Sequence, residues 1–282
     1  MLAPMLNIRP MTDADLPFGL RLSDQSHWNQ TDADWRRLLD MHSKGAWVAE
    51  WDGAPAGTTV TSRFGPVAWI SMVLIDEAMR GQGIGTALAK HALAELDRAR
   101  IPTVRLDATT LGQHLYAQLG FVEEFPLMRY DGVLPRAAEL AGCELAPPEE
   151  WETLAAFDQL VTGVDRRLLL TRLFAANRGA VQMDRLGAAL GGYCTSRPGR
   201  QAIQIGPCIA SPEAGPSLLV DAFRRHAGQR VFVDIPVANV AATRLAESHG
   251  LTVQRSFSRM ARGQPHRERI EWLWASSGPE NG

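Results

Sequence analysis

The spacing of apolar positions in the first 130 residues alternates between strand-like and helix-like segments. Residues 68–75 are almost continuously apolar, which is typical of a strand covered on both faces. A glycine-rich turn at residues 80–85 follows, and Ile84, Leu88 and Leu96 then recur at helical spacing. The pattern predicts the order β-α-α-β-β-β-α-β-α-β, a mixed sheet of the α/β class with helices packed on it. The predicted strands are residues 5–9, 47–51, 58–63, 68–75, 102–107 and 121–130, and the predicted helices begin at residues 12, 32, 84 and 110.

The sequence also contains an internal repeat. Residues 53–65 align with residues 187–199 at an offset of 134, and seven of the 13 positions are identical. Further matches keep the same order, as when Gly85 aligns with Gly215 at an offset of 130. Several matches in register favour two copies of one fold over chance. The predicted domains are residues 1–132 and 133–282, with a short linker near residues 132–139.

The turn Arg80-Gly81-Gln82-Gly83-Ile84-Gly85 has the composition of an anion site. Glycine allows a tight backbone and the close approach of a ligand. The first amides of the following helix lack internal partners, and the helix dipole favours negative charge there. A pyrophosphate suits such a turn. Two nucleotide motifs are excluded, because no GxxxxGK[ST] sequence is present and Thr86 stands where a dinucleotide-binding GxGxxG motif needs glycine.

A second motif lies on the helix that begins at residue 110, where Tyr116 precedes Gly120-Phe121. Together with the turn and the element order, it resembles the GNAT acyltransferases, the acetyl-CoA-dependent N-acetyltransferases. That family has a pyrophosphate turn [Q/R]-x-x-G-x-[G/A] after a long strand and a later Tyr-x-x-x-Gly-Phe. The resemblance covers residues 6–130 and implies two tandem GNAT-like domains once the repeat is considered.

The resemblance implies that an amine attacks acetyl-CoA directly, with no acyl-enzyme. Pantetheine is then expected beside residues 73–75 as an extra strand, with the amide of Val73 as the donor to the oxyanion. Tyr116 is expected to donate a proton or a hydrogen bond to the coenzyme A sulfur. The residues implied to contact the coenzyme are Val73, Leu74, Ile75, Arg80, Gly81, Gln82, Gly83, Ile84, Gly85 and Thr86.

The second copy resembles the degenerate domain that follows a working one in some tandem GNAT members. Its fold is expected to persist, whereas coenzyme binding and proton transfer are expected to be lost. The inference rests on four positions: Ala210 in place of Arg80, Glu213 in place of Gly83, Ala246 in place of Tyr116, and Pro212, which removes one amide donor.

Several assignments have a structural alternative. Tyr116 on an amphipathic helix is either the proton donor or a core aromatic. His114 is either a base or a solvated surface side chain, and it points away from Tyr116 on a helix. Asp76 and Glu77 follow the long strand, so one of them either deprotonates the amine through water or caps a turn.

The acceptor site is expected near Trp28, Asn29 and Gln30, between the first two helices, where GNAT folds bind the acceptor. Trp28 either stacks on the substrate or fills an apolar gap. Trp272 and Trp274 alternate on an apparent terminal strand, which favours packing in the core or between domains. The acceptor itself, a small-molecule or peptide amine, cannot be read from the sequence. The first 131 residues hold 12 basic and 16 acidic residues, and this net charge of −4 slightly favours a cationic amine.

Composition excludes several classes of protein. The 282 residues are 45% hydrophobic and carry a net charge of −2, which excludes intrinsic disorder and a basic nucleic-acid binder. No apolar run is long enough to span a membrane, and the first residues do not form a secretory signal. Three cysteines form neither a disulfide framework nor a metal pattern, so no metal and a cytoplasmic location are expected. An acyl-CoA-binding sensor and a protein-recognition module remain as alternatives to an enzyme, and the oligomeric state is not predicted.

Overall fold

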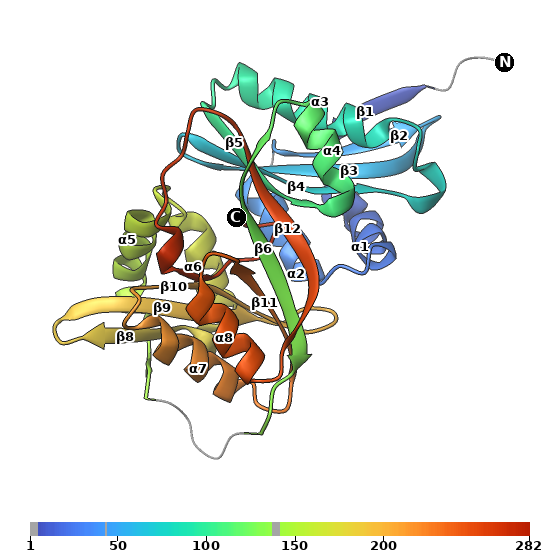
Figure 1. The fold of residues 1–282 in the computed structure, drawn as a ribbon. Helices are drawn as coiled ribbons and strands as arrows, with labels where there is room; N and C mark the ends of the chain where they lie inside the picture. Colours follow the sequence, from blue (N-terminus) through green and yellow to red (C-terminus); the bar gives the residue numbers. More distant parts are fainter. Residues whose placement is uncertain (1–4, 43, 137–141) are drawn as a thin grey trace.

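A computed structural model describes residues 5–42, 44–136 and 142–282, so part of the predicted linker, residues 137–139, lies outside the described residues. In the described chain the strands form one 13-stranded mixed sheet, in the order β1-β2-β3-β4-β5-β12-β6-β11-β10-β9-β8-β7, with β13 paired to β10 (Figure 1). The sheet therefore runs through both copies of the repeat without a break.

The two halves of the chain repeat the same order of elements, which confirms the predicted fold class and the repeat. The first half contains β1 (Leu6–Pro10), α1 (Leu16–Gln25), α2 (Asp32–Met41), β2 (Ala46–Trp51), β3 (Ala54–Phe64), β4 (Val67–Ile75), α3 (Ile84–Arg98), β5 (Thr103–Thr109), α4 (Thr110–Gln118) and β6 (Val122–Val133). The second half contains β7 (Glu144–Leu145), α5 (Trp151–Thr162), α6 (Arg167–Ala176), β8 (Gln182–Leu186), β9 (Ala189–Arg197), β10 (Ile203–Ala210), α7 (Gly215–Arg225), β11 (Arg230–Pro236), α8 (Val240–Ser248), β12 (Thr252–Gly263) and β13 (Leu273–Ala275).

The two halves exchange their last long strands. Strand β12 of the second half lies between β5 and β6 of the first, and β6 lies between β12 and β11 of the second half. The two exchanged strands also pair with each other, antiparallel, and cross the middle of the molecule side by side (Figure 1). Each half thus completes its sheet with a strand from the other.

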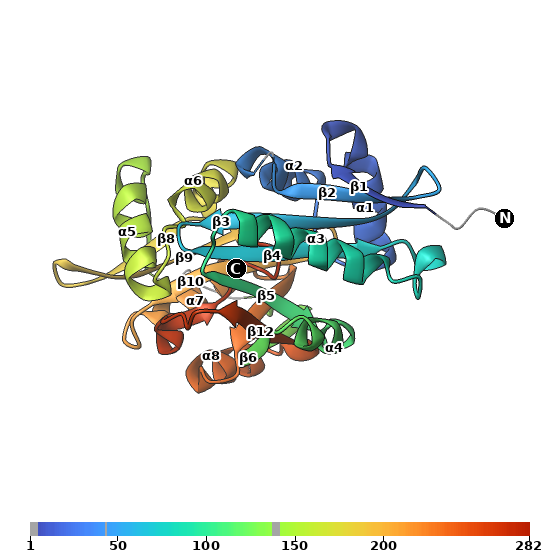
Figure 2. The same ribbon diagram turned by 90° about the horizontal axis from the view of Figure 1, so that it is seen from above.

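The exchange extends into the hydrophobic cores. Met260 of β12 is buried in the first-half core, beneath α3 and α4, together with Tyr116 and Phe121. In return, Tyr130 of β6 is buried in the second-half core against α7 and α8. Helices α2 and α6, one from each half, also touch and lie next to each other in Figure 2. Neither core is complete without the other half.

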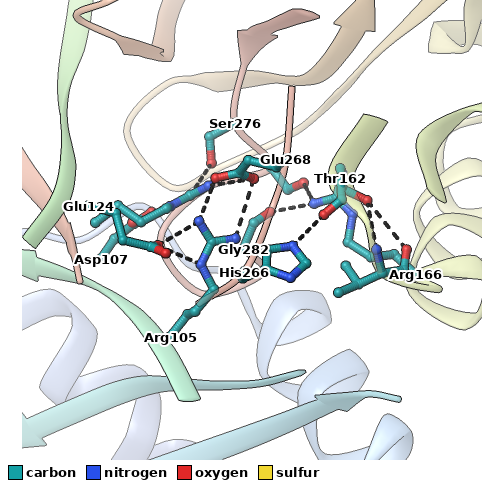
Figure 3. Close-up of polar contacts among 12 residues, drawn as sticks. Arg105, Asp107, Glu124, Thr162, Arg166, His266, Glu268, Ser276 and Gly282 are labelled. Atoms are coloured by element: carbon teal, nitrogen blue, oxygen red, sulfur yellow. Dashed lines mark hydrogen bonds and ion pairs between the residues drawn. The ribbon is translucent and has the colours of Figure 1, made fainter. Parts of the chain in front are cut away.

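Buried ion pairs join the halves on the face of the sheet opposite α3 and α4. Arg105 of β5 binds both Glu124 of the first half and Glu268 of the second, and Figure 3 shows its guanidinium between the two carboxylates. Arg259 of β12 makes a bidentate pair with Asp107 of β5, with both N–O distances 2.9 Å. Since the surrounding strands exclude water, the Arg105–Glu268 and Arg259–Asp107 pairs each hold a strand of one half to a segment of the other.

The C-terminal segment, residues 276–282, runs back between the two halves on that face. Trp69 Nε1 of β4 donates to the carbonyl oxygen of Pro279 at 2.8 Å. The Glu280 side chain is fully buried, where it accepts from Gln30 Nε2 at 2.8 Å and from Arg197. This segment brings a carboxylate of the second half to the edge of the first half's strands.

Candidate active site

The parallel strands β4 and β5 separate towards their carboxyl ends. They pair only from Val67↔Thr103 to Trp69↔Arg105, although β4 continues to Ile75. Beyond the last pair, residues 70–75 and 106–112 line a cavity of about 690 Å³. In the gap between the two diverging strands, backbone groups have no neighbouring strand to pair with. An extended molecule can lie there and form hydrogen bonds with them.

A β-bulge in β4 shapes one wall of this cavity. Thr58 pairs with Leu74 and Val60 with Ser71, so two residues of β4, Met72 and Val73, oppose a single residue of β3. Met72 has a φ of +53°, and its carbonyl oxygen accepts from Thr58 Oγ1 at 2.8 Å. Val73, the residue expected to donate to an oxyanion, therefore lies on the cavity wall directly after a kink that reorients the backbone.

The predicted anion turn links β4 to α3 and is exposed. Gly81 and Gly83 have φ values of +81° and +79°, a region that favours glycine, and a Cβ atom on either would meet nothing within 4 Å. Gly83 is the N-cap of α3 and supplies no side-chain cap, so the first amides of α3 remain available to a ligand. Gly85 and Arg80 lie at the edge of the cavity, which joins the turn to the space between the strands.

The position of Tyr116 on α4 is compatible with both interpretations made from the sequence. Its ring is buried and packs edge-on against Phe121, with 5.8 Å between ring centroids. The same side chain lines the cavity, and burial raises the pKa of its hydroxyl above the ordinary value. The hydroxyl is consequently protonated at neutral pH, as a proton donor must be.

The three residues expected at the acceptor site are placed differently from one another. Trp28 lines the cavity. Gln30 reaches the cavity wall through its hydrogen bond to Glu280. Asn29 instead joins the halves, because its side chain donates to the carbonyl oxygen of Ala202 at 3.0 Å and accepts from the amide of Gln201 at 3.0 Å. Its amide is thus used in a contact between the halves, away from the cavity.

The second half contributes cavity residues that the sequence analysis missed. They are Arg255, Ser256 and Phe257 of β12, with Pro279 and Glu280 of the C-terminal segment. All of them reach the first half through the strand exchange or the returning segment. No local pattern in the sequence predicts the strand exchange or the returning segment. The sequence analysis therefore could not place these residues at the cavity, and the pairing of the strands was needed to find them.

Comparison with known proteins identifies the family. Residues 12–121 match a family model described as the acetyltransferase (GNAT) family, and residues 154–275 match one described as an acetyltransferase (GNAT) domain. The two matches together cover most of the chain. This protein is a tandem GNAT acetyltransferase. GNAT proteins generally bind acetyl-CoA, and the general activity of the family is acetyl transfer.

Solved structures share the fold of this GNAT protein. A putative acetyltransferase from Pyrococcus horikoshii is 24% identical, with a TM-score of 0.81 over 98% of this chain and 96% of that one. A GCN5-related N-acetyltransferase from Sphaerobacter thermophilus is 15% identical, with a TM-score of 0.66 over 94% and 98% of the two chains. A tandem GNAT protein from the clavulanic acid biosynthesis pathway is 13% identical, with a TM-score of 0.65 over 93% and 100%. Among curated proteins, none matches the sequence.

The second GNAT half has the same diverging strands, but its gap is filled. Strands β10 and β11 pair only from Ile203↔Val231 to Ile205↔Val233. Strand β13 then enters between them and pairs antiparallel with β10, while the amide of Ser276 donates to the carbonyl oxygen of Asp234 at 2.8 Å. The chain's own strand thus lies in the second half where the first half has its cavity.

Trp274 of β13 closes the second gap against the start of α7. It is buried, and its Nε1 donates to the carbonyl oxygen of Ala210 at 3.2 Å. A Cβ atom placed on Gly215 would stand 1.8 Å from the indole, so this glycine of the repeat now makes room for tryptophan. The packing expected for Trp272 and Trp274 is confirmed for Trp274, which is in the second-half core.

The remaining candidates for the base differ in position. Asp76 accepts from the amide of Ala78 at 3.1 Å and pairs with Arg21, which is the turn-capping alternative. Glu77 lines the cavity 3.5 Å from Arg80. His114 contacts Gln118 on α4 and does not line the cavity. Among the described residues, no helix is long and apolar enough to cross a membrane, and no group of side chains is arranged to hold a metal ion.

Proposed function

We propose that the first half of this protein catalyses transfer of an acetyl group from acetyl-CoA to an amine, and that the second half does not bind the coenzyme. One observation carries the proposal: the gap between the diverging strands is a cavity in the first half and is occupied by β13 in the second. The repeats at 1–132 and 133–282 then have different tasks, chemistry in one and completion of the cavity wall in the other.

The residues of the first half fit an acyl-CoA substrate along the whole cavity. Pantetheine takes the place of a strand beside Val73, Leu74 and Ile75, whose backbone faces the gap. The diphosphate binds the turn, where amides from Gln82 to Thr86 meet it at the helix N-terminus. The left-handed glycines of the turn leave room for the diphosphate, and the unpaired end of β4 leaves backbone groups available to pantetheine.

Transfer needs an oxyanion donor and a proton for the departing sulfur. The amine nitrogen attacks the thioester carbon and forms the new C–N bond, and the C–S bond breaks when the resulting oxyanion re-forms the carbonyl. The Val73 amide donates to the carbonyl oxygen while it carries negative charge. Tyr116 donates its proton to the thiolate and regains one from solvent, and the amine loses its extra proton to water. The buried, neutral hydroxyl of Tyr116 suits this step.

The alternatives are an acyl-CoA sensor and a recognition module, and turnover separates them from an enzyme. The experiment is release of free coenzyme A thiol from acetyl-CoA, measured with and without a panel of amines. An enzyme releases thiol only when an amine is present and acetylates that amine. Binding of acetyl-CoA without turnover of any amine would favour the sensor. Calorimetric titration is expected to give one coenzyme per chain, and two equivalent sites would contradict the assignment to one half.

The cellular compartment follows as part of the same proposal. Cys143, Cys194 and Cys208 are free thiols in the structure, and Cys194 lies opposite Cys208 across β9 and β10. Free thiols, two of them on neighbouring strands, suit a reducing cytoplasm.

A further inference from the structure

Arg255 on β12 is a cavity residue without a partner. It is half-buried and lines the cavity of the first half. Across residues 5–42, 44–136 and 142–282, no hydrogen bond or ion pair involves its guanidinium. A guanidinium cannot lose its charge at physiological pH, so this wall of the cavity carries a fixed positive charge.

The charges around Arg255 leave it unneutralised. Arg129 and Asp234 are the charged groups that act on Arg255, and burial together with Arg129 lowers the pKa of Arg255 from its ordinary value. Both oxygens of Asp234 are already bound by Arg129, at 2.7 and 2.8 Å, and one of them also accepts from Gln204 at 3.2 Å. Asp234 therefore faces two guanidinium groups, and it accepts hydrogen bonds from Arg129 and Gln204 but none from Arg255.

Other buried arginines on this side of the sheet each have their own carboxylate. Arg259 is paired with Asp107, and Arg197 with Glu280. A half-buried guanidinium without such a partner is only partly surrounded by water, and it is free to form a charge-assisted hydrogen bond with an anion that enters the cavity. Arg255 thus differs from its neighbours in a way that a ligand with a negative group would correct.

The position of Arg255 assigns that ligand to the acceptor side of the cavity. Side chains alternate between the two faces of a strand, and Met260 of β12 faces the core beneath α3 and α4. Arg255, Phe257 and Arg259 alternate with it and face the opposite side, where the C-terminal segment lies. The predicted diphosphate turn begins α3, on the Met260 side. A negative group at Arg255 therefore belongs to a molecule that enters from the other face.

A second polar group without a partner lies in the same cavity. The side chain of Ser71 on β4 is only 7% exposed, and its Oγ has no hydrogen-bond partner in the described part of the chain. Ser71 lines the cavity and precedes the bulge that holds Met72 and Val73. A buried hydroxyl left unpaired is costly, so a polar group of the ligand is expected beside it.

We propose that Arg255 binds a carboxylate of the acceptor, so that the acceptor is an amine that also carries a carboxylate, such as an amino acid or a short peptide. This inference rests on the proposed function of the cavity. The second half then supplies specificity for the reaction of the first, through a strand that only the exchange brings to the cavity. The net charge of the first half slightly favoured a cationic amine. The positive charge of Arg255 inside the cavity instead favours an amine that also carries a carboxylate.

The test compares matched acceptors on the full-length protein. Amino acids with one to four carbons between amine and carboxylate are each assayed beside their carboxamide and their decarboxylated amine. The variants are Arg255→Gln and Arg255→Lys, with Arg262→Gln as the control. Arg262 lies on the same strand, pairs with Asp97 at the surface and does not line the cavity.

We expect the protein to prefer the carboxylated acceptors and Arg255→Gln to raise their KM about 10- to 100-fold, the range for loss of a hydrogen-bonded charge. The KM for acetyl-CoA and the rates with the neutral amines should not change, and Arg255→Lys should restore part of the affinity. Equal sensitivity of neutral and carboxylated amines would overturn the inference. A raised KM for acetyl-CoA would also overturn it, because the charge would then serve the coenzyme.

A binding readout separates failure of this inference from failure of the proposed function. The melting temperature of the coenzyme A-saturated protein is measured with each acceptor of the panel. A rise with carboxylated amines that Arg255→Gln abolishes supports the inference even if no acetyl transfer is detected. No such rise overturns it. Failure of acetyl-CoA itself to bind is a separate result, which rejects the proposed function, and the same thermal shift without coenzyme then decides the role of Arg255.

Discussion

The two halves of this protein treat the same gap in opposite ways. In the first half, β4 and β5 diverge around a cavity of about 690 Å³, whereas in the second half β13 fills the space between β10 and β11. Protein interiors are close-packed, and an apolar gap without an occupant is destabilising. On the proposed assignment of the chemistry to the first half, the difference teaches that a duplicated fold without a substrate still needs something in the substrate's place.

The turns after the two strands differ in the same direction. Gly81 and Gly83 keep the left-handed conformations that open the first turn, while the second turn has Pro212 and Glu213. At the start of the second helix, Gly215 now packs against Trp274 rather than beside a ligand. The second turn thus loses an amide donor at Pro212 and gains an exposed carboxylate at Glu213, while the helix start behind it packs against tryptophan.

The strongest challenge to this comparison is to remove the second half. A fragment of residues 1–133 lacks β12, which separates β5 from β6, and lacks Met260 in its core. We expect it to lose the cooperative thermal transition of the full chain and to aggregate, because the edge of β5 becomes exposed. Circular dichroism and light scattering measure both. A soluble, cooperatively folded fragment as active as the full chain would show that the second half is dispensable.

The next largest effect should come from Gly83→Glu, which copies the second half's turn into the first. A carboxylate at the N-terminus of α3 opposes the diphosphate, and we expect calorimetry to detect no coenzyme binding. The site has open space, so the fold should persist with a loss of about 1–2 kcal/mol from the strained φ. Gly83→Ala carries the same strain without the charge and should keep measurable binding. Equal affinities for the two variants would reject the role of charge.

Tyr116→Phe should affect rate more than binding. General acid catalysis contributes about 10²- to 10⁴-fold, and the ring that packs on Phe121 is retained. We expect kcat to fall within that range while the affinity for acetyl-CoA is nearly unchanged, measured by pre-steady-state kinetics and calorimetry. A rate equal to that of the unmodified protein, with chemistry rate-limiting, would make Tyr116 a core aromatic with a packing role only, as its buried counterpart Ala246 has in the second half.

Trp274→Ala should leave the chemistry intact and reduce stability. Removing a buried tryptophan costs about 3–5 kcal/mol of unfolding free energy, which urea denaturation can measure. Trp272→Ala, on a partly exposed neighbour, should cost less. We expect no second coenzyme site in Trp274→Ala, because Pro212 and Glu213 remain in the turn. Two coenzymes per chain would show that β13 alone keeps the second gap closed.

The sequence predicted features that depend on neighbouring residues. The order of elements in the first half is confirmed, and α2 begins at Asp32, as predicted. That start is fixed locally, since Thr31 Oγ1 accepts from the amide of Asp34 while the Asp34 carboxylate accepts from the amide of Thr31. The turn before α3 likewise depends on its own glycines.

What the sequence did not predict depends on partners far along the chain. The alternating apolar and polar residues of β12 are compatible with pairing in either half. No local feature of the sequence therefore predicts that β12 pairs with β5. Arg255 and Glu280 therefore could not be placed at the cavity. Asn29 was assigned to the acceptor because it lies between two helices, but its partners, Gln201 and Ala202, belong to a loop of the second half.

The exchange of strands also has a consequence for synthesis on the ribosome. Thr109 at the end of β5 pairs with Phe257 of β12, which is synthesised roughly 150 residues later. At about 5–20 residues per second, the first half spends about 7–30 s with the edge of β5 unpaired and one wall of its cavity unbuilt. The cavity of the first half therefore cannot be completed before β12 has been synthesised, and a nascent chain stalled before β12 emerges exposes a β-strand edge to any chaperone or aggregating partner nearby.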